Sequence, residues 1–94
     1  MNSNCIVLDV FNTTQLGEVA IIAFPESKIP KMKMVLENKF NLKWEIVGIT
    51  ANRSNEPLKK YSGYKAQSIW ACALKTLSHS NAVNKNDILH IVND

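Results

Sequence analysis

Apolar and polar positions follow a strand-like pattern in two early segments of the chain. One face of Cys5–Phe11 (CIVLDVF) is apolar, and Asp9 interrupts the other face. The next such segment, Glu18–Phe24 (EVAIIAF), is more continuously apolar, as expected for a central strand that is covered on both faces. Residues 12–17 between them are polar and end in glycine, which suits a hairpin loop. We therefore predict two neighbouring antiparallel strands.

Helical periodicity follows the second strand. Ser27 is a candidate N-cap, and Pro30 is tolerated in the first turn of a helix, where backbone donors lack helical partners. The apolar residues that recur at helical spacing are Ile29, Met32, Leu36 and Phe40. This pattern predicts a helix that buries Met32 and leaves Met34, which falls off the stripe, on the surface.

Alternation returns in Leu42–Thr50 (LKWEIVGIT), where Trp44 and Ile46 share one face of a third predicted strand. Gly48 is a candidate for a bulge or for a close approach of another strand. Together with the preceding strand and helix, this segment predicts a β-α-β unit over Glu18–Thr50. Its crossover is right-handed if the two strands are parallel in one sheet.

Two segments near the C-terminus also show helical spacing. In Tyr64–Ser78, apolar and small residues form a stripe that predicts a second helix packed on the sheet. The segment Asn84–Asp94 is ambiguous, because its β-branched residues suit an edge strand while their spacing is helical. The pair Asn84 and Asp87 resembles a capping box, and this favours the helix.

The expected architecture is a single α+β domain over residues 1–94, with two layers and the element order β-β-α-β-α, followed by a final short helix or edge strand. The sheet is small and mixed. A chain of 94 residues supports one core, and its 46% apolar and 20% charged residues are ordinary for a globular protein. An outer strand of this sheet is an edge that invites pairing with a partner strand or a second copy.

The two cysteines, Cys5 and Cys72, lie in apolar surroundings, where cysteine usually acts as a small hydrophobic residue. Two cysteines cannot make a disulfide framework, and no signal-peptide pattern precedes the first strand. The longest apolar run, Val19–Phe24, is too short to span a bilayer. We expect a reducing, cytoplasmic location without membrane contact.

Signatures of catalysis are missing from the sequence. Its serines stand outside nucleophile-elbow contexts, and its three glycines are too scattered to cradle a phosphate. Cys72 could pair with His79 or His90 as nucleophile and base, and Asp87 could join them as a metal ligand. Zinc sites normally use close pairs of cysteine or histidine, and none occurs here. We therefore expect a protein that is not an enzyme, with no cofactor and no metal.

A basic and aromatic segment is the best candidate site for nucleic acid or for a protein partner. Cations can contact phosphates, and tyrosines can stack on bases. The residues concerned are Arg53, Lys59, Lys60, Tyr61, Tyr64 and Lys65. A net charge of +3 is only a mild basic bias, so a solvated loop is the alternative interpretation of this segment.

Residues 59–77 (KKYSGYKAQSIWACALKTL) locally resemble the lysine-led, alanine-rich last helix of double-stranded-RNA-binding domains. Pro30–Val47 loosely resembles the first helix and first strand of that family. The resemblance implies that Lys59, Lys60 and Lys65 contact phosphates. The chain departs from the family, because residues 48–58 leave no room for its second and third strands, and we do not assign membership.

Without signs of chemistry, the sequence favours a small non-enzymatic regulator that binds another protein, as an inhibitor or adaptor, alone or as a homodimer. Trp44 and Trp70 are large for so small a core, so one of them is a candidate interface anchor if it is not buried. The alternative function is a nucleic-acid-binding module that uses segment 53–65.

Overall fold

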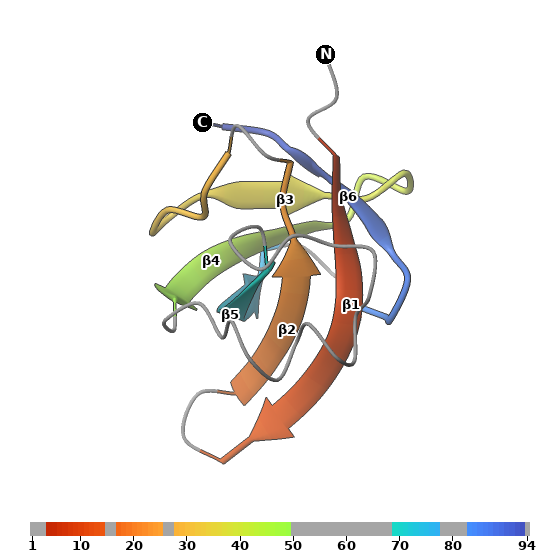
Figure 1. Cartoon of the computed structure of the whole chain (residues 1–94). Helices are drawn as coiled ribbons and strands as arrows, with labels where there is room; N and C mark the ends of the chain where they lie inside the picture. Colours follow the sequence, from red (N-terminus) through yellow and green to blue (C-terminus); the bar gives the residue numbers. More distant parts are fainter. Residues whose placement is uncertain (1–3, 15–16, 26–27, 50–68, 78–82, 94) are drawn as a thin grey trace.

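The computed structural model describes residues 4–14, 17–25, 28–49, 69–77 and 83–93, and it contains six strands (Figure 1). The strands are β1 (Asn4–Thr13), β2 (Gly17–Ala23), β3 (Val35–Glu37), β4 (Lys43–Ile49), β5 (Ile69–Thr76) and β6 (Ile88–Ile91). The described residues contain no helix.

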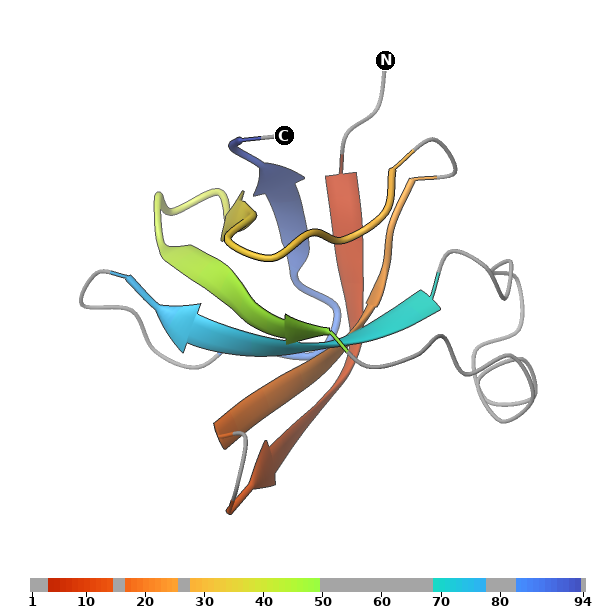
Figure 2. The same cartoon turned by 90° about the vertical axis from the view of Figure 1, so that its left-hand side faces the viewer.

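The six strands form one closed barrel in the order β1-β2-β5-β4-β3-β6, and each neighbouring pair is antiparallel (Figures 1 and 2). Three pairs of strands are adjacent both in sequence and in the barrel: β1–β2, β3–β4 and β4–β5. The chain from β2 to β3 and the chain from β5 to β6 instead pass to strands that are not neighbours in the sheet. Closure pairs every described strand on both sides, which removes the free edges of an open sheet.

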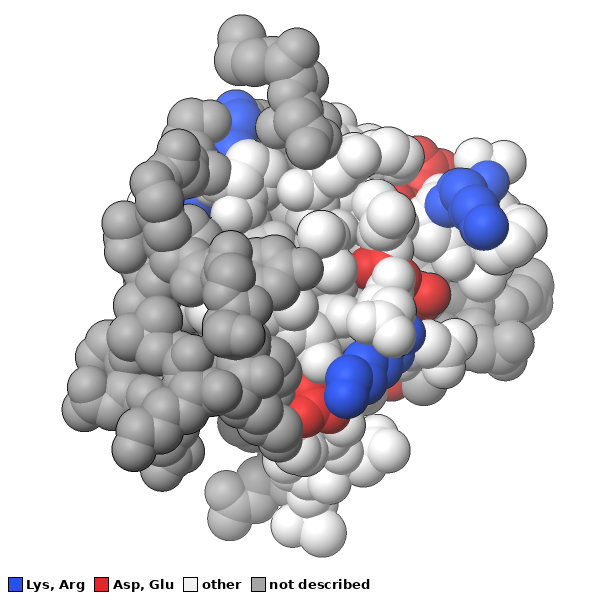
Figure 3. Space-filling view, turned by 45° about the vertical axis from the view of Figure 1, so that its right-hand side comes forward, with Lys and Arg blue, Asp and Glu red and all other residues white. Residues whose placement is uncertain are grey.

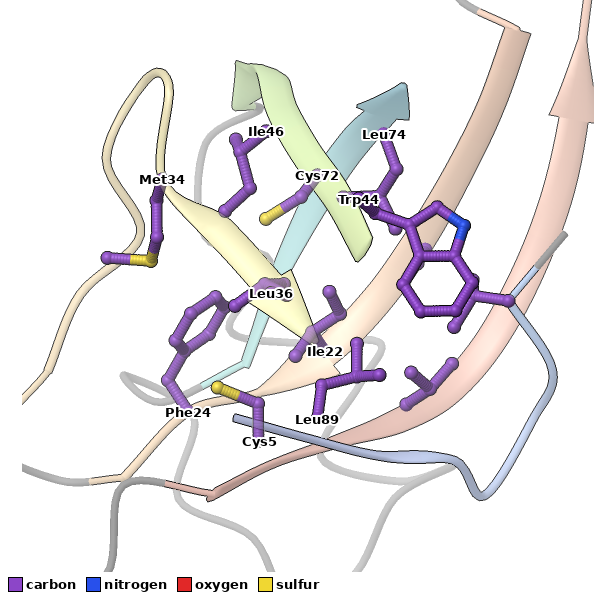
Figure 4. Packing of buried hydrophobic residues seen from close by; sticks show 13 residues of the cluster. Cys5, Ile22, Phe24, Met34, Leu36, Trp44, Ile46, Cys72, Leu74 and Leu89 are labelled. Atoms are coloured by element: carbon purple, nitrogen blue, oxygen red, sulfur yellow. The ribbon is translucent and has the colours of Figure 1, made fainter. Parts of the chain in front are cut away.

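The interior of the barrel is filled by side chains from all six strands, as expected for a barrel of this size (Figure 4). The fully buried residues there include Cys5 on β1, Ile22 on β2, Leu36 on β3, Trp44 and Ile46 on β4, Cys72 on β5 and Leu89 on β6. Burying one such Leu or Ile side chain contributes about 1.5–3 kcal/mol, so this cluster is the main source of stability.

The predicted hairpin and third strand are confirmed. Strands β1 and β2 are antiparallel neighbours, with Thr13 opposite Gly17 at the turn, and Gly17 has a positive φ of 74° that suits glycine. The register between β4 and β5 shifts between Ile46 and Gly48, which confirms the expected bulge. A Cβ atom added to Gly48 would lie 3.2 Å from the Cβ of Ala73, so the two strands also approach closely there.

The helix predicted between Ser27 and Phe40 is wrong. Lys33 has a positive φ of 70°, which the interior of an α-helix does not contain, and the short strand β3 follows it within the predicted span. Burial is the reverse of the expectation for the two methionines: Met34 is 3% exposed in the core, whereas Met32 is 58% exposed. The predicted β-α-β unit is therefore replaced by a strand, a turn and a β-hairpin.

The two later helices are corrected as well. Residues 69–76 of the predicted helix Tyr64–Ser78 form β5, and residues 64–68 and 78 lie outside the described residues. Segment 84–94 contributes β6, a strand, although it is not the edge strand that was the alternative, since β1 and β3 flank it. One bond of the expected capping box exists, because the Asn84 N–H donates to Asp87 Oδ2 at 2.8 Å. The Asp87 N–H instead donates to the main-chain carbonyl of Asn84 at 3.1 Å, which closes a turn.

These differences overturn the α+β, mixed-sheet architecture. The described chain is an all-antiparallel barrel, and the two strands expected to be parallel, β2 and β4, are not neighbours. The local resemblance to double-stranded-RNA-binding domains does not extend to the fold, because the segments matched to that family's helices contain β3 and β5.

Candidate functional site

Large apolar side chains that face solvent gather at one part of the described surface. Eight large hydrophobic residues are exposed among the described residues: Phe11, Ile29, Met32, Phe40, Val47, Leu77, Ile88 and Val92. Two of them, Ile29 and Met32, lie in the segment Lys28–Val35, which Figure 2 shows as the gold trace on the side facing the viewer. Two more, Val47 and Val92, lie in the segments that bond to residues 33–35. We call this group, Ile29, Met32, Val47 and Val92 with the lysines Lys31 and Lys33, the 28–35 surface.

A tight turn presents Met32 at the centre of this surface. The N–H of Met34 donates to the carbonyl of Lys31 at 3.1 Å, which closes a four-residue turn with Met32 and Lys33 at its central positions. Lys33 has a φ of 70°, a left-handed conformation that is uncommon for a residue with a Cβ. Holding a lysine there costs of order 1 kcal/mol, so the rest of the fold must stabilise the turn.

Hydrogen bonds from two neighbouring segments stabilise this turn. On one side, the Lys33 N–H donates to the Ile46 carbonyl at 2.8 Å, and the Ile46 N–H donates to the Met34 carbonyl at 2.8 Å. On the other side, Asn93 Nδ2 donates to the Lys33 carbonyl at 3.3 Å, and the Val92 N–H donates to the Val35 carbonyl at 2.8 Å.

The same hydrogen bonds place the backbones of two other exposed apolar residues beside the turn. Val47 follows Ile46 directly, and Val92 itself bonds to Val35, so both residues flank the turn that carries Met32. Buried side chains on either side of the turn, Pro30 and Met34, anchor the segment to the barrel. The surface is therefore apolar at its centre and fixed by backbone contacts.

The charge of the 28–35 surface is positive. Lys31 and Lys33 are exposed on either side of Met32, and the sequence from residue 28 to residue 36 contains no acidic residue. Elsewhere on the barrel, opposite charges face each other across strands, as at Glu45–Lys75 and at Glu37–Lys43. Figure 3, which brings the right-hand side of Figure 1 forward, shows acidic and basic side chains close to one another on that face.

The sequence-predicted binding residues all lie outside the described part of the chain. These residues are Arg53, Lys59, Lys60, Tyr61, Tyr64 and Lys65. Their role as a site for nucleic acid or for a partner therefore stays a prediction. The 28–35 surface was missed, because its residues were assigned to a helix with Ile29 and Met32 in the core.

The candidate catalytic and metal-ligating residues are not brought together where the structure describes them. Cys72 is buried inside the barrel, whereas His90 is exposed on β6, next to the inward-facing Leu89. The Asp87 carboxylate accepts a hydrogen bond from the Asn84 N–H, and His79 lies outside the described residues. Within the described ranges, no group of three or more histidine, cysteine, aspartate or glutamate residues could hold a metal ion.

Both thiols are free and buried. Burial raises the pKa of Cys5 to about 12, and burial together with the nearby Cys5 raises the pKa of Cys72 to about 12. A thiol that stays protonated at neutral pH is a poor nucleophile, because the thiolate is the reactive form. Both cysteines therefore serve the core, as their sequence context indicates.

The two tryptophans differ in exposure, and an interface role for either of them stays a prediction. Trp44 is fully buried in the barrel, and Trp70 is half-buried and packs against the same core cluster. Strands β1 and β4 each have a neighbouring strand on both sides, but β1 pairs with β6 over Asn4–Ile6 and with β2 over Ile6–Thr13, so most of its length is paired on one side.

Comparisons of the chain with models of protein families, with curated proteins and with solved structures find no match. In the part of the chain that the structure describes, no helix has the length and apolar character needed to cross a membrane.

Proposed function

We propose that this chain is a small non-enzymatic protein-binding module, of the inhibitor or adaptor type, that contacts its partner through the 28–35 surface. The observation that supports this proposal is the hydrogen-bonded turn that exposes Met32, with the exposed Val47 and Val92 in the two segments that bond to residues 33–35. Single exposed apolar residues are common on soluble proteins, but neighbouring ones around a fixed backbone are typical of interaction sites.

The composition of the surface suits a protein partner. Methionine is enriched in interfaces and adapts its shape to a partner, and aliphatic side chains such as Val47 and Val92 add apolar area. Base stacking instead requires aromatic rings, and this surface has none. The hydrogen-bonded turn also lowers the entropy that Met32's backbone would lose on binding.

A photo-crosslinking amino acid at position 32 tests this proposal in the intact chain. The matched control carries the same group at Ile88, which is 53% exposed and lies at the start of β6 opposite Ile6, away from the turn. We expect position 32, and not position 88, to form an adduct with a protein. The crosslinked protein is then purified and titrated against the unmodified chain.

The titration compares the parent with Met32→Glu and with Ile88→Glu. We expect Met32→Glu to weaken binding at least tenfold and Ile88→Glu to leave it unchanged, since only the first places a charge in the apolar contact. An adduct between two copies of the chain, confirmed by light scattering, identifies the partner as self. Equal binding by the parent and Met32→Glu would show that the 28–35 surface is not the binding site.

We further propose a reducing, cytoplasmic setting for this interaction. The support is that Cys5 and Cys72 are both free thiols inside the barrel. Mass measurement of the protein isolated under alkylating conditions tests this, with two added alkyl groups after denaturation as the expected result.

A further inference from the structure

We infer that the partner of the 28–35 surface presents an acidic segment in which apolar residues lie between carboxylates. This inference rests on the proposed function, and it adds the chemistry of the partner. Its basis is the alternation of cations and apolar side chains in the segment KIPKMK, residues 28–33.

The turn fixes this alternation in space. Met32 and Lys33 are its two central residues and Lys31 its first, so the exposed methionine lies between two exposed lysines. The backbone of Lys33 is held by Ile46 on one side and by Asn93 on the other. Groups of the partner that flank an apolar side chain in contact with Met32 can therefore meet Lys31 and Lys33.

The positive charge of this surface is not neutralised by the residues that the structure describes. No described acidic group pairs with Lys31 or Lys33, and the backbone neighbours of the turn are Ile46, Val92 and Asn93. Glu45, the acidic residue of β4, is opposite Val35 at the edge of the segment and opposite Lys75 on its other side, so a lysine of β5 is its cross-strand counterpart. Carboxylates of a partner would complete this charge pattern, whereas a basic partner would be repelled.

The apolar residues and the lysines of the surface should affect different rate constants of binding. Apolar contact with Met32 resists dissociation, while rim charges such as Lys31 and Lys33 mainly accelerate encounter and make it salt-dependent. An acidic segment should therefore associate faster at low salt. Anionic membranes and nucleic acids also attract lysines, and the experiment below includes both as outcomes.

The test is a selection of random twelve-residue peptides displayed on phage against the native full chain, with counter-selection against Met32→Glu. We expect the enriched peptides to combine aspartate or glutamate with aliphatic or aromatic residues. A synthetic peptide of the enriched sequence should bind the parent with at least tenfold higher affinity than it binds Met32→Ser. The double variant Lys31→Glu/Lys33→Glu should reduce the association rate constant about tenfold, and salt should reduce that of the parent.

Circular dichroism and thermal unfolding of each variant confirm that the fold is retained, and Lys85→Glu is a matched control in an exposed turn. Enriched peptides that need Met32 but are neutral or basic would overturn the inference and leave the proposed function intact. Peptides that bind all variants equally, or the lack of any enriched peptide, would contradict both. Two further outcomes would also overturn the inference when no acidic peptide is selected. They are binding to vesicles containing one third phosphatidylserine and binding to a twenty-nucleotide single strand, in each case with binding lost in Lys31→Glu/Lys33→Glu.

Discussion

The side-chain oxygen of Asn93 accepts a hydrogen bond from the backbone N–H of Val35 at 2.6 Å, across fifty-eight positions of the sequence. The Nδ2 of the same amide donates to the Lys33 carbonyl at 3.3 Å. One side chain beyond the end of β6 thus bonds to backbone groups on both sides of Met34, at the exit of the turn that exposes Met32. This arrangement couples the C-terminal segment to the candidate binding surface.

Replacing Asn93 should therefore weaken the fold and the turn together. Asn93→Ala should lower the free energy of unfolding by about 0.5–1.5 kcal/mol, because both hydrogen bonds are lost at a solvent-exposed site. Asn93→Asp keeps an acceptor for the Val35 N–H and removes only the donor to Lys33, so it should lower the free energy of unfolding by less than Asn93→Ala does. Urea denaturation monitored by tryptophan fluorescence measures both, and a loss in Asn93→Asp larger than in Asn93→Ala would contradict this role.

The two methionines of the turn provide a matched pair of substitutions. Met34→Ala should lower the free energy of unfolding by about 2–5 kcal/mol, because it leaves a cavity in the barrel interior. Met32→Ala should change it by less than about 0.5 kcal/mol, because the side chain is largely exposed. Chemical denaturation of both variants distinguishes the barrel from a helix with Met32 in the core. For such a helix, Met32→Ala would be the more destabilising of the two substitutions.

The close approach of β4 and β5 at Gly48 predicts a specific coupling. Gly48→Val should lower the free energy of unfolding by about 1–3 kcal/mol, because its side chain has no room beside the Cβ of Ala73 at this bulge. In the background Ala73→Gly, the same substitution should be less costly. A double-mutant cycle measures this difference, and strictly additive effects would show that the two positions are not in contact.

The buried thiols predict a loss of stability at alkaline pH. In the unfolded chain a thiol titrates near 9, whereas Cys5 and Cys72 in the barrel hold their protons to about 12. Between these values the native state binds more protons than the unfolded state, so the free energy of unfolding falls as pH rises, by up to about 1.4 kcal/mol per pH unit for each thiol.

The measurement is urea denaturation from pH 8 to pH 10.5, compared with Cys5→Ala and Cys72→Ala. Each substitution should make the pH dependence shallower, which separates the thiols from lysine and tyrosine groups that titrate in the same range. The native thiols should also resist an aromatic disulfide reagent at pH 8 and react after denaturation. Rapid reaction of either thiol in the native protein would contradict its burial.

The strands that can be predicted from the sequence either alternate clearly, as β4 and β1 do, or form a continuous apolar run beside a hairpin loop, as β2 does. Strand β4 carries Trp44 and Ile46 inward and Lys43 and Glu45 on the other face, and β1 and β2 are joined by a polar hairpin segment. In each of these strands a local pattern agrees with the tertiary fold, and the prediction was correct.

Strand β5 could not be recognised from its own pattern. Its inward residues, including Trp70 and Cys72, and its outward residues, including Ile69 and Ala71, are all apolar and partly or fully buried, so the two-residue period is hidden. The alanines of β5 have a high helix propensity, but pairing with β2 and β4 on either side outweighs it.

Around β3 the sequence contains asparagines that favour turns, but this signal is weaker than the helical spacing of the apolar residues. Asn38 accepts hydrogen bonds at Oδ1 from the N–H groups of Phe40 and Leu42, and Asn41 takes the left-handed conformation that asparagine tolerates. Two asparagines between apolar segments therefore indicated a turn. The left-handed Lys33 carried no such signal, because its conformation is imposed by contacts with Ile46 and Asn93 from distant parts of the chain.

Binding through the 28–35 surface is tested most directly by nuclear magnetic resonance of methionine methyl groups during titration with the selected acidic peptide. The Met32→Leu variant assigns the Met32 signal, and Met34 is an internal reference only two residues away. We predict that the Met32 methyl resonance shifts to saturation with the peptide, while that of Met34 moves little. A peptide that binds without moving the Met32 resonance would contradict the proposed surface.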